Sequence, residues 1–239
     1  MGIPLLNDLT GQVALVSGAN RGIGAQVAID LAALGATVYA GARDPDALQG
    51  VADASDGRIR PVRLDVTDEA TITVAVAQVV ADMGRLDLVV NNAGIGDWHG
   101  AVLHTLDTDS LDHVLATNLR GPMLMAKHTV PHLLERRGGR IVNVSSGMGA
   151  LGEGMNGTAP AYRVSKTALN GLTAYLAGEY GPRGLIAASV CPGWVRTDMG
   201  GPNATRPVEK GAASVLHACR LAAGAPNGRF WRDGHLIDW

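Results

Sequence analysis

Short apolar runs alternate along the whole chain with longer stretches in which apolar positions recur three and four apart. The runs predict buried strands, and the longer stretches predict helices. The predicted strands are 12–17, 37–40, 58–64, 86–90, 140–144, 185–190 and 228–231, and the predicted helices are 25–34, 68–83, 110–137 with an interruption near Gly121-Pro122, 161–180 and 208–223. This alternation predicts an α/β fold with a doubly wound, mostly parallel, seven-stranded sheet and helices on both faces. No linker or repeat interrupts it, so we expect a single domain over residues 1–239.

The turn after the first predicted strand is rich in glycine, with Gly18, Gly22 and Gly24 leading into the first predicted helix. Glycines let the backbone approach a pyrophosphate at a helix N-terminus, where free N–H groups and the helix dipole favour an anion. Strand, glycine turn, helix and strand form the opening of a Rossmann-type dinucleotide-binding unit, although the spacing here is G-x-x-x-G-x-G. The alternative for this segment alone is a glycine-rich turn without a ligand.

Composition and charge argue against several other classes of protein. The net charge is −2 and the sequence has no basic cluster, which argues against nucleic acid as a partner. No apolar run reaches the roughly 18 residues of a membrane span, and the first residues lack the pattern of a secretory signal. Cys191 and Cys219 have no metal-ligand spacing, so we expect no metal and free thiols in a cytoplasmic protein.

Tyr162 and Lys166 are the first candidates for catalytic chemistry. They stand four positions apart, which places both side chains on one face of a helix. A phenol has a pKa of about 10, and a neighbouring ammonium group lowers it. A phenol tuned in this way can protonate a carbonyl oxygen as hydride reaches the carbon, or deprotonate an alcohol in reverse. A chance pair on a solvated helix face is the alternative.

The surrounding motifs occur in a recognisable order: Ser17-Gly18-x-x-x-Gly22-Ile23-Gly24, Asn91-Asn92-Ala93-Gly94, Asn118, Ser146, Tyr162-x-x-x-Lys166 and Pro192-Gly193. From about Leu9 to its C-terminus the chain therefore resembles the short-chain dehydrogenases/reductases. The segments 193–199 and 230–234 look like the NADPH-dependent carbonyl reductase branch of that family. The resemblance implies an NADP-dependent oxidoreductase that acts on alcohol and carbonyl groups.

The resemblance also implies a role for each motif. Tyr162 is the general acid/base, Ser146 holds the substrate oxygen, and Lys166 lowers the phenol pKa and binds the nicotinamide ribose. Asn118 holds a water that links Lys166 to solvent. The implied cofactor-binding residues are Gly18, Asn20, Arg21, Gly22, Ile23, Gly24, Arg43, Asp65, Val66, Asn92, Ala93, Gly94, Tyr162, Lys166, Pro192, Gly193, Val195 and Thr197.

Four of these assignments have structural alternatives. Ser145 could be the catalytic serine, because neighbouring strand residues face opposite sides, but the family pattern favours Ser146. Asn118 could be only a polar residue at a helix kink, and the segment 91–94 only a turn after a strand. Asp65, which by resemblance contacts the adenine amine, could be an ordinary turn aspartate.

The end of the second predicted strand favours NADP(H) over NAD(H). In the NAD-preferring pattern an acidic residue ends this strand and takes the ribose hydroxyls. Here Ala42 stands at that place, Arg43 follows, and Arg21 lies in the glycine turn. Two guanidinium groups can bind one 2′-phosphate with charge-assisted contacts. We interpret Asp44 with Pro45 as the cap and first turn of the next helix; two solvated arginines are the alternative.

The segment 147–160 is the longest irregular part of the chain, and loops of this length are usually functional. It separates Ser146 from Tyr162 by 16 positions, which is wider than the family usually shows. Large apolar residues in the loops predict an open pocket for a bulky, apolar ketone or aldehyde, with a small lid at 197–207. Some of them could instead be scattered surface residues. The predicted substrate residues are Trp98, Ser146, Met148, Leu151, Met155, Trp194 and Met199.

We therefore expect an NADPH-dependent carbonyl reductase that also oxidises alcohols. One alternative is a 3-oxoacyl-carrier-protein reductase, for whose acidic partner Arg136, Arg137 and Arg140 could form a basic patch, although we favour a solvated helix end for these arginines. Another is an NADP-sensing regulator without activity, against which the intact catalytic motif argues. An apolar stripe on the helix 161–180 predicts a homotetramer or homodimer. A monomer, with the stripe facing only the sheet, is the alternative; the stripe residues are Ala168, Leu169, Leu172, Leu176 and Ala177.

Overall fold

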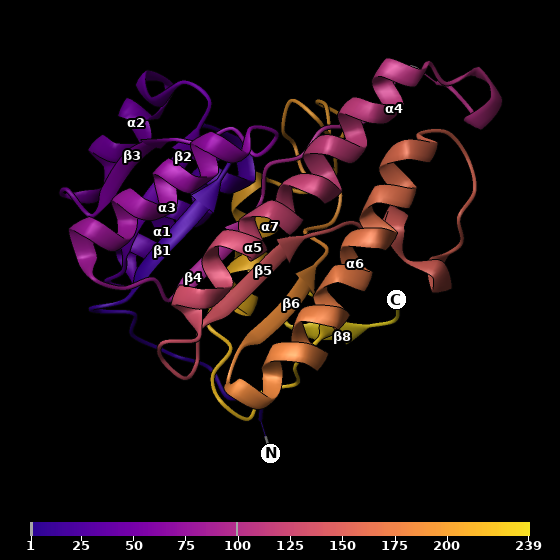
Figure 1. The fold of residues 1–239 in the computed structure, drawn as a ribbon. Coiled ribbons are helices and arrows are strands. Elements are labelled where there is room, and N and C mark those ends of the chain that lie inside the picture. The colour runs from indigo at the N-terminus through magenta and orange to yellow at the C-terminus, as the bar shows by residue number, and fades with distance from the viewer. Residues whose placement is uncertain (1, 99) are drawn as a thin grey trace.

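The computed structural model describes residues 2–98 and 100–239, and the strands of these residues form one sheet of eight (Figure 1). The strands are β1 (Val13–Ser17), β2 (Thr37–Ala42), β3 (Ile59–Arg63), β4 (Leu88–Asn91), β5 (Arg140–Val144), β6 (Ile186–Val190), β7 (Arg229–Arg232) and β8 (His235–Ile237). The helices are α1 (Gly22–Ala33), α2 (Gln49–Ala52), α3 (Glu69–Met83), α4 (Thr108–Leu115), α5 (Gly121–Leu133), α6 (Pro160–Tyr180) and α7 (Val208–Cys219).

Period-two alternation along the strands divides the core into two layers. In β1, Ala14 and Val16 belong to the layer that packs against α1 and α7. Val13 and Leu15 belong to the opposite layer, which packs against α3, α5 and α6. Figure 1 shows α3, α5 and α6 over the near face of the sheet. Both faces are therefore covered, as expected for strands that are apolar at nearly every position.

The strand order is β3-β2-β1-β4-β5-β6-β7-β8, and neighbours from β3 to β7 are parallel. The chain builds outward from β1 in one direction and then restarts at β4 in the other. Such a switch point opens a crevice outside the carboxyl ends of β1 and β4. The predicted Rossmann-type, doubly wound architecture is confirmed.

The eighth strand differs from the prediction of seven. β8 pairs antiparallel with β7 through a two-residue turn, Asp233-Gly234, in which both residues have positive φ, 52° and 79°. An Asp-Gly pair is a strong hairpin signal because its backbone twist matches that of the strands it joins. The signal was present in the sequence, but β8 is too short to show its own alternation.

The helix predicted over 110–137 is divided and shorter than expected. It consists of α4, a π-helical turn at Ala116–Arg120 and α5, which ends at Leu133. Asp107 caps the start, accepting a hydrogen bond from the backbone N–H of Ser110. The expected interruption near Gly121-Pro122 is present: Pro122 has no N–H to donate to the carbonyl of Asn118, four residues earlier.

None of the helices in the described part of the chain is long and apolar enough to span a membrane.

Candidate active site

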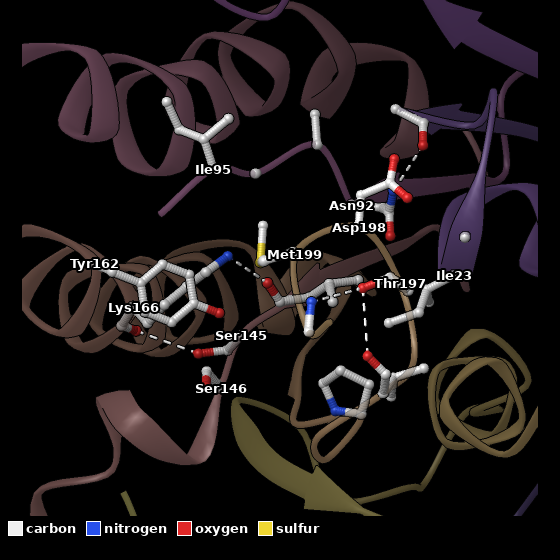
Figure 2. Close-up of a pocket in the computed structure, with 18 of the residues that line it drawn as sticks. Ile23, Asn92, Ile95, Ser145, Ser146, Tyr162, Lys166, Thr197, Asp198 and Met199 are labelled. Atoms are coloured by element: carbon white, nitrogen blue, oxygen red, sulfur yellow. Dashed lines mark hydrogen bonds between the residues drawn. The ribbon is translucent and has the colours of Figure 1, made fainter. Parts of the chain in front are cut away.

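A cavity of about 1370 Å³ lies at the carboxyl ends of the central strands. It extends from the glycine turn after β1 to the first turns of α6 and the loops after β5 and β6. Figure 2 shows Tyr162, Lys166 and Ser146 on one side of this space and Ile23, Asn92 and Thr197 on the other. The fold therefore brings the predicted catalytic and cofactor motifs together around one cavity.

The glycine turn is built for close approach of backbone to backbone. Gly18 has a φ of 62°, and a Cβ there would lie 2.9 Å from the Cα of Ala93. Gly24 packs so closely on the carbonyl of Gly18 that a side chain has no room. The amide of Asn92 donates to the carbonyls of Ser17 and Gly18 at 3.0 and 2.9 Å. The end of β4 thus fixes the turn through its side chain.

The N-terminus of α1 meets the requirements of a phosphate site. Its N-cap, Arg21, makes no side-chain cap hydrogen bond, so the first N–H groups and the helix dipole stay available to an anion. Gly22 lies at the cavity with a φ of 56°, and a Cβ there would touch Thr197. A dinucleotide pyrophosphate fits this cradle, which an added methyl group would fill.

Arg43 is exposed at the end of β2 and lines the cavity, as does the neighbouring Ala42. Asp44 accepts a hydrogen bond from the backbone N–H of Asp46 and caps the 3₁₀ turn that begins at Pro45, which confirms its interpretation as a cap. Arg21 is also exposed but forms an ion pair of 2.5 Å with Asp198, across the mouth of the cavity. A 2′-phosphate bound by Arg21 must compete with this carboxylate.

The cofactor residues predicted from the sequence are placed as follows. Asp65 accepts hydrogen bonds from the backbone N–H and hydroxyl of Thr67, so it shapes the turn after β3 while lining the cavity. Gly24 does not line the cavity; it packs beneath the glycine turn. The others line it: Gly18, Asn20, Arg21, Gly22, Ile23, Arg43, Val66, Asn92, Ala93, Gly94, Tyr162, Lys166, Pro192, Gly193, Val195 and Thr197.

Tyr162 and Lys166 lie one turn apart on the buried face of α6. Burial raises the pKa of Tyr162 to about 12, and the neighbouring Ser146 hydroxyl opposes the rise. Burial lowers the pKa of Lys166 to about 8. The expectation that Lys166 depresses the phenol pKa is not met in the protein without cofactor. The ammonium lies over the ring face, 5.6 Å from its centroid, and donates to the carbonyl of Val144 at 2.8 Å.

The two serines after β5 have separate tasks. The hydroxyl of Ser145 is buried and donates to the backbone carbonyl of Lys166 at 3.3 Å. Ser146 is half-buried, lies close enough to Tyr162 to lower its pKa, and accepts a hydrogen bond from the backbone N–H of Met148 at 3.1 Å. Period-two alternation therefore turns Ser146, not Ser145, toward the phenol.

Asn118 lies in the π-helical turn and does not line the cavity. Its side-chain oxygen accepts the N–H of Ile95, and its amide donates to the carbonyl of Ile95 and the hydroxyl of Ser165. The side chain thus joins the loop after β4 to α6. This engagement is specific and goes beyond that of a polar residue at a kink.

The loop after β4 supplies two residues that sequence reasoning missed or only partly assigned. Asp97 is buried, and its two side-chain oxygens accept the backbone N–H groups of Ala161 and Tyr162, both at 3.1 Å. Trp98 packs on the ring of Tyr162 with centroids 4.8 Å apart. Asp97 had one sequence signal, an acidic residue within an otherwise apolar, glycine-rich segment, but its partners are 64 and 65 positions away.

The substrate end of the cavity is more polar than expected. Trp98, Met148, Trp194 and Met199 line it, as predicted from their loops. Met155 and Leu151 lie outside the lining, because the loop carries Glu153, Gly154 and Asn156 toward the cavity instead. Charged residues that the sequence did not single out complete the wall: Glu153, Arg163, Asp198, Arg206 and Arg232.

Two bidentate ion pairs hold this wall together. Arg232 binds Glu153 with contacts of 2.9 and 3.1 Å, and Arg206 binds Asp233 with two contacts of 2.8 Å. The backbone N–H of Gly152 also donates to the carbonyl of Trp239 at 2.8 Å. Contacts with the β7–β8 hairpin and with the residues after it therefore hold the loop 147–160 in place.

Residues 12–207 match the sequence model of the family described as short chain dehydrogenase. The chain belongs to this family. It is accordingly an NAD(P)-dependent oxidoreductase.

Curated relatives and solved structures support the placement. The chain is 36% identical over 217 residues to Short chain dehydrogenase pigC of Monascus ruber, covering 87% of this chain and 70% of that protein. It is 34% identical over 192 residues to 3-oxoacyl-[acyl-carrier-protein] reductase FabG of Escherichia coli (strain K12), covering 80% and 77%. The NADPH-bound carbonyl reductase from chicken fatty liver superposes with a TM-score of 0.87 at 30% identity, covering 98% of this chain and 100% of that one.

Proposed function

We propose that this member of the short-chain dehydrogenase family is an NADPH-dependent carbonyl reductase that reduces bulky ketones or aldehydes and runs in reverse on alcohols. The observation that carries the proposal is the position of the Ser146 hydroxyl next to the phenol of Tyr162 at the cavity, with Lys166 one turn further along α6. With a pKa of about 12, the phenol holds its proton at neutral pH. That is the protonation state that an acid for carbonyl reduction requires.

NADPH, when bound, supplies the hydride for this reaction. Ser146 and Tyr162 hold the substrate oxygen, and the phenol of Tyr162 donates its proton to it. Lys166 places a positive charge beside the phenol and replenishes its proton. By family resemblance, Asn118 holds a relay water; since its side chain is bound to Ile95 and Ser165, we assign this contact to its backbone carbonyl, to which Pro122 cannot donate. In the alcohol direction, the positive charge of the oxidised nicotinamide favours the phenolate.

The preference for NADPH rests on the end of β2. Ala42 presents no carboxylate to the ribose, and Arg43 is exposed beside it. Arg21 is the second cation within the glycine turn, and we expect it to exchange Asp198 for the 2′-phosphate. Both guanidinium groups can offer paired donors to phosphate oxygens.

A carrier-protein thioester is the competing substrate, since the chain is similar to a 3-oxoacyl-[acyl-carrier-protein] reductase. Of the three arginines considered for a basic patch, Arg140 does not contribute to one. Arg140 is buried, with 3% of its surface exposed, and donates to the side chain of Gln12. It also begins β5, so it lies at the amino-terminal end of the strands, away from the cavity at their carboxyl ends. This observation favours small carbonyl compounds.

A homodimer or homotetramer is the expected assembly, through a groove that includes only two residues of the predicted stripe, Leu172 and Leu176. Leu169 and Leu176 are both buried within the subunit, and Leu176 belongs to the core layer between the sheet and α3, α5 and α6. The groove between α5 and α6 instead exposes Met123 and Tyr175, and we propose that a second copy of the chain covers it. Light scattering at micromolar concentration tests this; a single mass of 24.7 kDa would contradict it.

The decisive experiment is a substrate panel with purified protein. NADPH oxidation is followed with small alkyl ketones, aryl ketones, an aldehyde and a β-ketoacyl thioester, and then repeated with NADH. We expect higher kcat/KM for aryl ketones than for acetone and a preference for NADPH. Comparable values for acetone and an aryl ketone would contradict an apolar pocket. The highest kcat/KM with the thioester would establish the competing function, and no turnover with any member would favour the regulator.

A further inference from the structure

The start of α6 lacks a capping side chain of its own. Ala159, at the N-cap, is a non-glycine residue with a φ of 62°, and no side-chain cap hydrogen bond comes from it. Pro160 follows at the first helical position, so the first N–H groups that need partners are those of Ala161 and Tyr162. Left unpaired in a buried place, such groups destabilise the turn that carries Tyr162.

The side chain of Asp97, in the loop after β4, provides the missing hydrogen-bond acceptors. One of its side-chain oxygens accepts the N–H of Ala161 and the other accepts the N–H of Tyr162. Only 1% of its surface is exposed, and no ion pair of residues 2–98 and 100–239 includes it. The side chain of Asp97 is therefore stabilised in its buried place by the two N–H groups and by the positive end of the α6 dipole. Asp97 does not line the cavity, so it acts on Tyr162 through the backbone.

The neighbours of Asp97 hold the same loop in place. Ile95 is bound through both its N–H and its carbonyl by Asn118. Trp98 packs on the ring of Tyr162, and a Cβ on Gly96 would overlap its indole. The segment 95–98 thus contacts Tyr162 twice, at the backbone N–H through Asp97 and at the ring through Trp98.

We infer that Asp97 is a positioning residue for Tyr162: its side chain, bound to the first turn of α6, sets the place of the phenol relative to Ser146 and the cofactor. The inference rests on the proposed role of Tyr162 as the proton donor. The Asp97→Asn variant keeps the size and leaves one acceptor, but its amide N–H₂ then faces a backbone N–H. We expect a loss of kcat of about tenfold to a hundredfold, since a displacement of about 1 Å can cost that much.

Affinity for the cofactor separates this effect from general damage. The Kd of NADPH, measured by its fluorescence, should stay within about twofold, because the glycine turn and β2 bind it at the other end of the cavity. Asp68→Ala is the matched control: Asp68 caps α3 by the same kind of contact, to the N–H of Ala70, and α3 contributes no residue to the cavity. It should lower Tm as much as Asp97→Asn does and leave kcat within about twofold.

A double variant tests whether Asp97 acts through Tyr162. In a Tyr162→Phe background, at a higher enzyme concentration, Asp97→Asn should change the residual rate by less than about twofold. An equal fold-loss in both backgrounds, or a kcat of Asp97→Asn within twofold of wild type, would overturn the inference. If Tyr162→Phe itself keeps the wild-type rate, the proposed function fails instead.

Hydrogen exchange tests the same contact without any variant. First-turn amides of a helix usually exchange quickly, because they have no partner within the helix. The amides of Ala161 and Tyr162 should be protected in the wild-type protein. Rapid exchange at both positions would overturn the inference even if Asp97→Asn did not fold.

Discussion

The two ends of the cavity are built on different principles. At the cofactor end, short turns leave the strands, and glycine, backbone and one amide side chain define the shape; Asn92 ties β4 to the turn after β1. At the substrate end, long loops and the β7–β8 hairpin meet through ion pairs between side chains. Main-chain geometry beside regular strands leaves little freedom, whereas loops tolerate change. We therefore expect the cofactor end to resemble that of relatives and the substrate end to be particular to this chain.

Tyr162 stands where the two ends meet, so its change should have the largest effect. Tyr162→Phe keeps the ring and its packing on Trp98 but removes the proton. We expect kcat for ketone reduction to fall by about 10²–10⁴, with Tm and the Kd of NADPH nearly unchanged. Retention of more than a few per cent of kcat would show that another group is the acid.

The cofactor preference is tested by changing the charges at the end of β2. The double variant Ala42→Asp with Arg43→Leu should reverse the preference from NADPH toward NADH, because a carboxylate repels the 2′-phosphate and one charged contact is lost. Each lost contact of this kind costs roughly 1.5–3 kcal/mol. The measurement is kcat/KM for both cofactors.

Arg63→Leu is the control for that exchange. Arg63 is exposed at the end of the adjacent strand β3, pairs in register with Ala42, and does not line the cavity. It should leave the ratio of kcat/KM for NADPH to kcat/KM for NADH unchanged. If the double variant kept the cofactor preference of the wild type, Arg43 would not be a contact of the 2′-phosphate. A wild-type protein that already prefers NADH would contradict the same assignment.

Lys166 links the site to the stability of the fold. Burial lowers its pKa to about 8 in the native protein, whereas an unfolded lysine has a pKa of about 10.4. Between these values the unfolded chain binds more protons, so this group makes the unfolding free energy rise with pH. The gain is on the order of 3 kcal/mol from pH 7 to 11.

Lys166→Met should remove that rise while abolishing most of the activity. Urea denaturation of both proteins at pH 7, 8, 9 and 10 measures the difference. Because the buried ammonium of the wild type is least favourable at low pH, the excess in unfolding free energy of Lys166→Met over the wild type is greatest at pH 7 and shrinks toward pH 10. A constant difference over this range would contradict the lowered pKa.

The smallest effect is expected at the substrate wall. Glu153→Gln breaks a half-exposed ion pair with Arg232, and such pairs contribute about 0–1 kcal/mol. We expect KM for a bulky ketone to change by about two- to fivefold and the Kd of NADPH to stay the same. Glu135→Gln, which breaks a surface pair with His132 away from the cavity, is the control. Equal effects of the two variants would show that the wall does not depend on this contact.

Local sequence patterns were enough to predict the sheet and the cofactor end of the cavity. Buried parallel strands are nearly all apolar, and the glycine turn has to be glycine because Gly18 and Gly24 pack on backbone atoms. The order of the elements therefore predicted the doubly wound fold, which the structure confirms. The Asp-Gly turn of β8 was equally local, yet a strand of three residues is too short for periodicity to reveal it.

Only the tertiary structure decided which side chains meet across long separations. Asp97 reaches the start of α6, Glu153 meets Arg232, and Arg140 turns into the interior, and no spacing in the sequence encodes these meetings. The same holds for the pKa of Tyr162: the motif Tyr-x-x-x-Lys suggested a lowered value, but burial, which depends on all the surrounding elements, raises it to about 12. The sequence determined which chemical groups are present and on which elements they lie. Their environment, and so their protonation in the free protein, followed from packing between residues far apart in the chain.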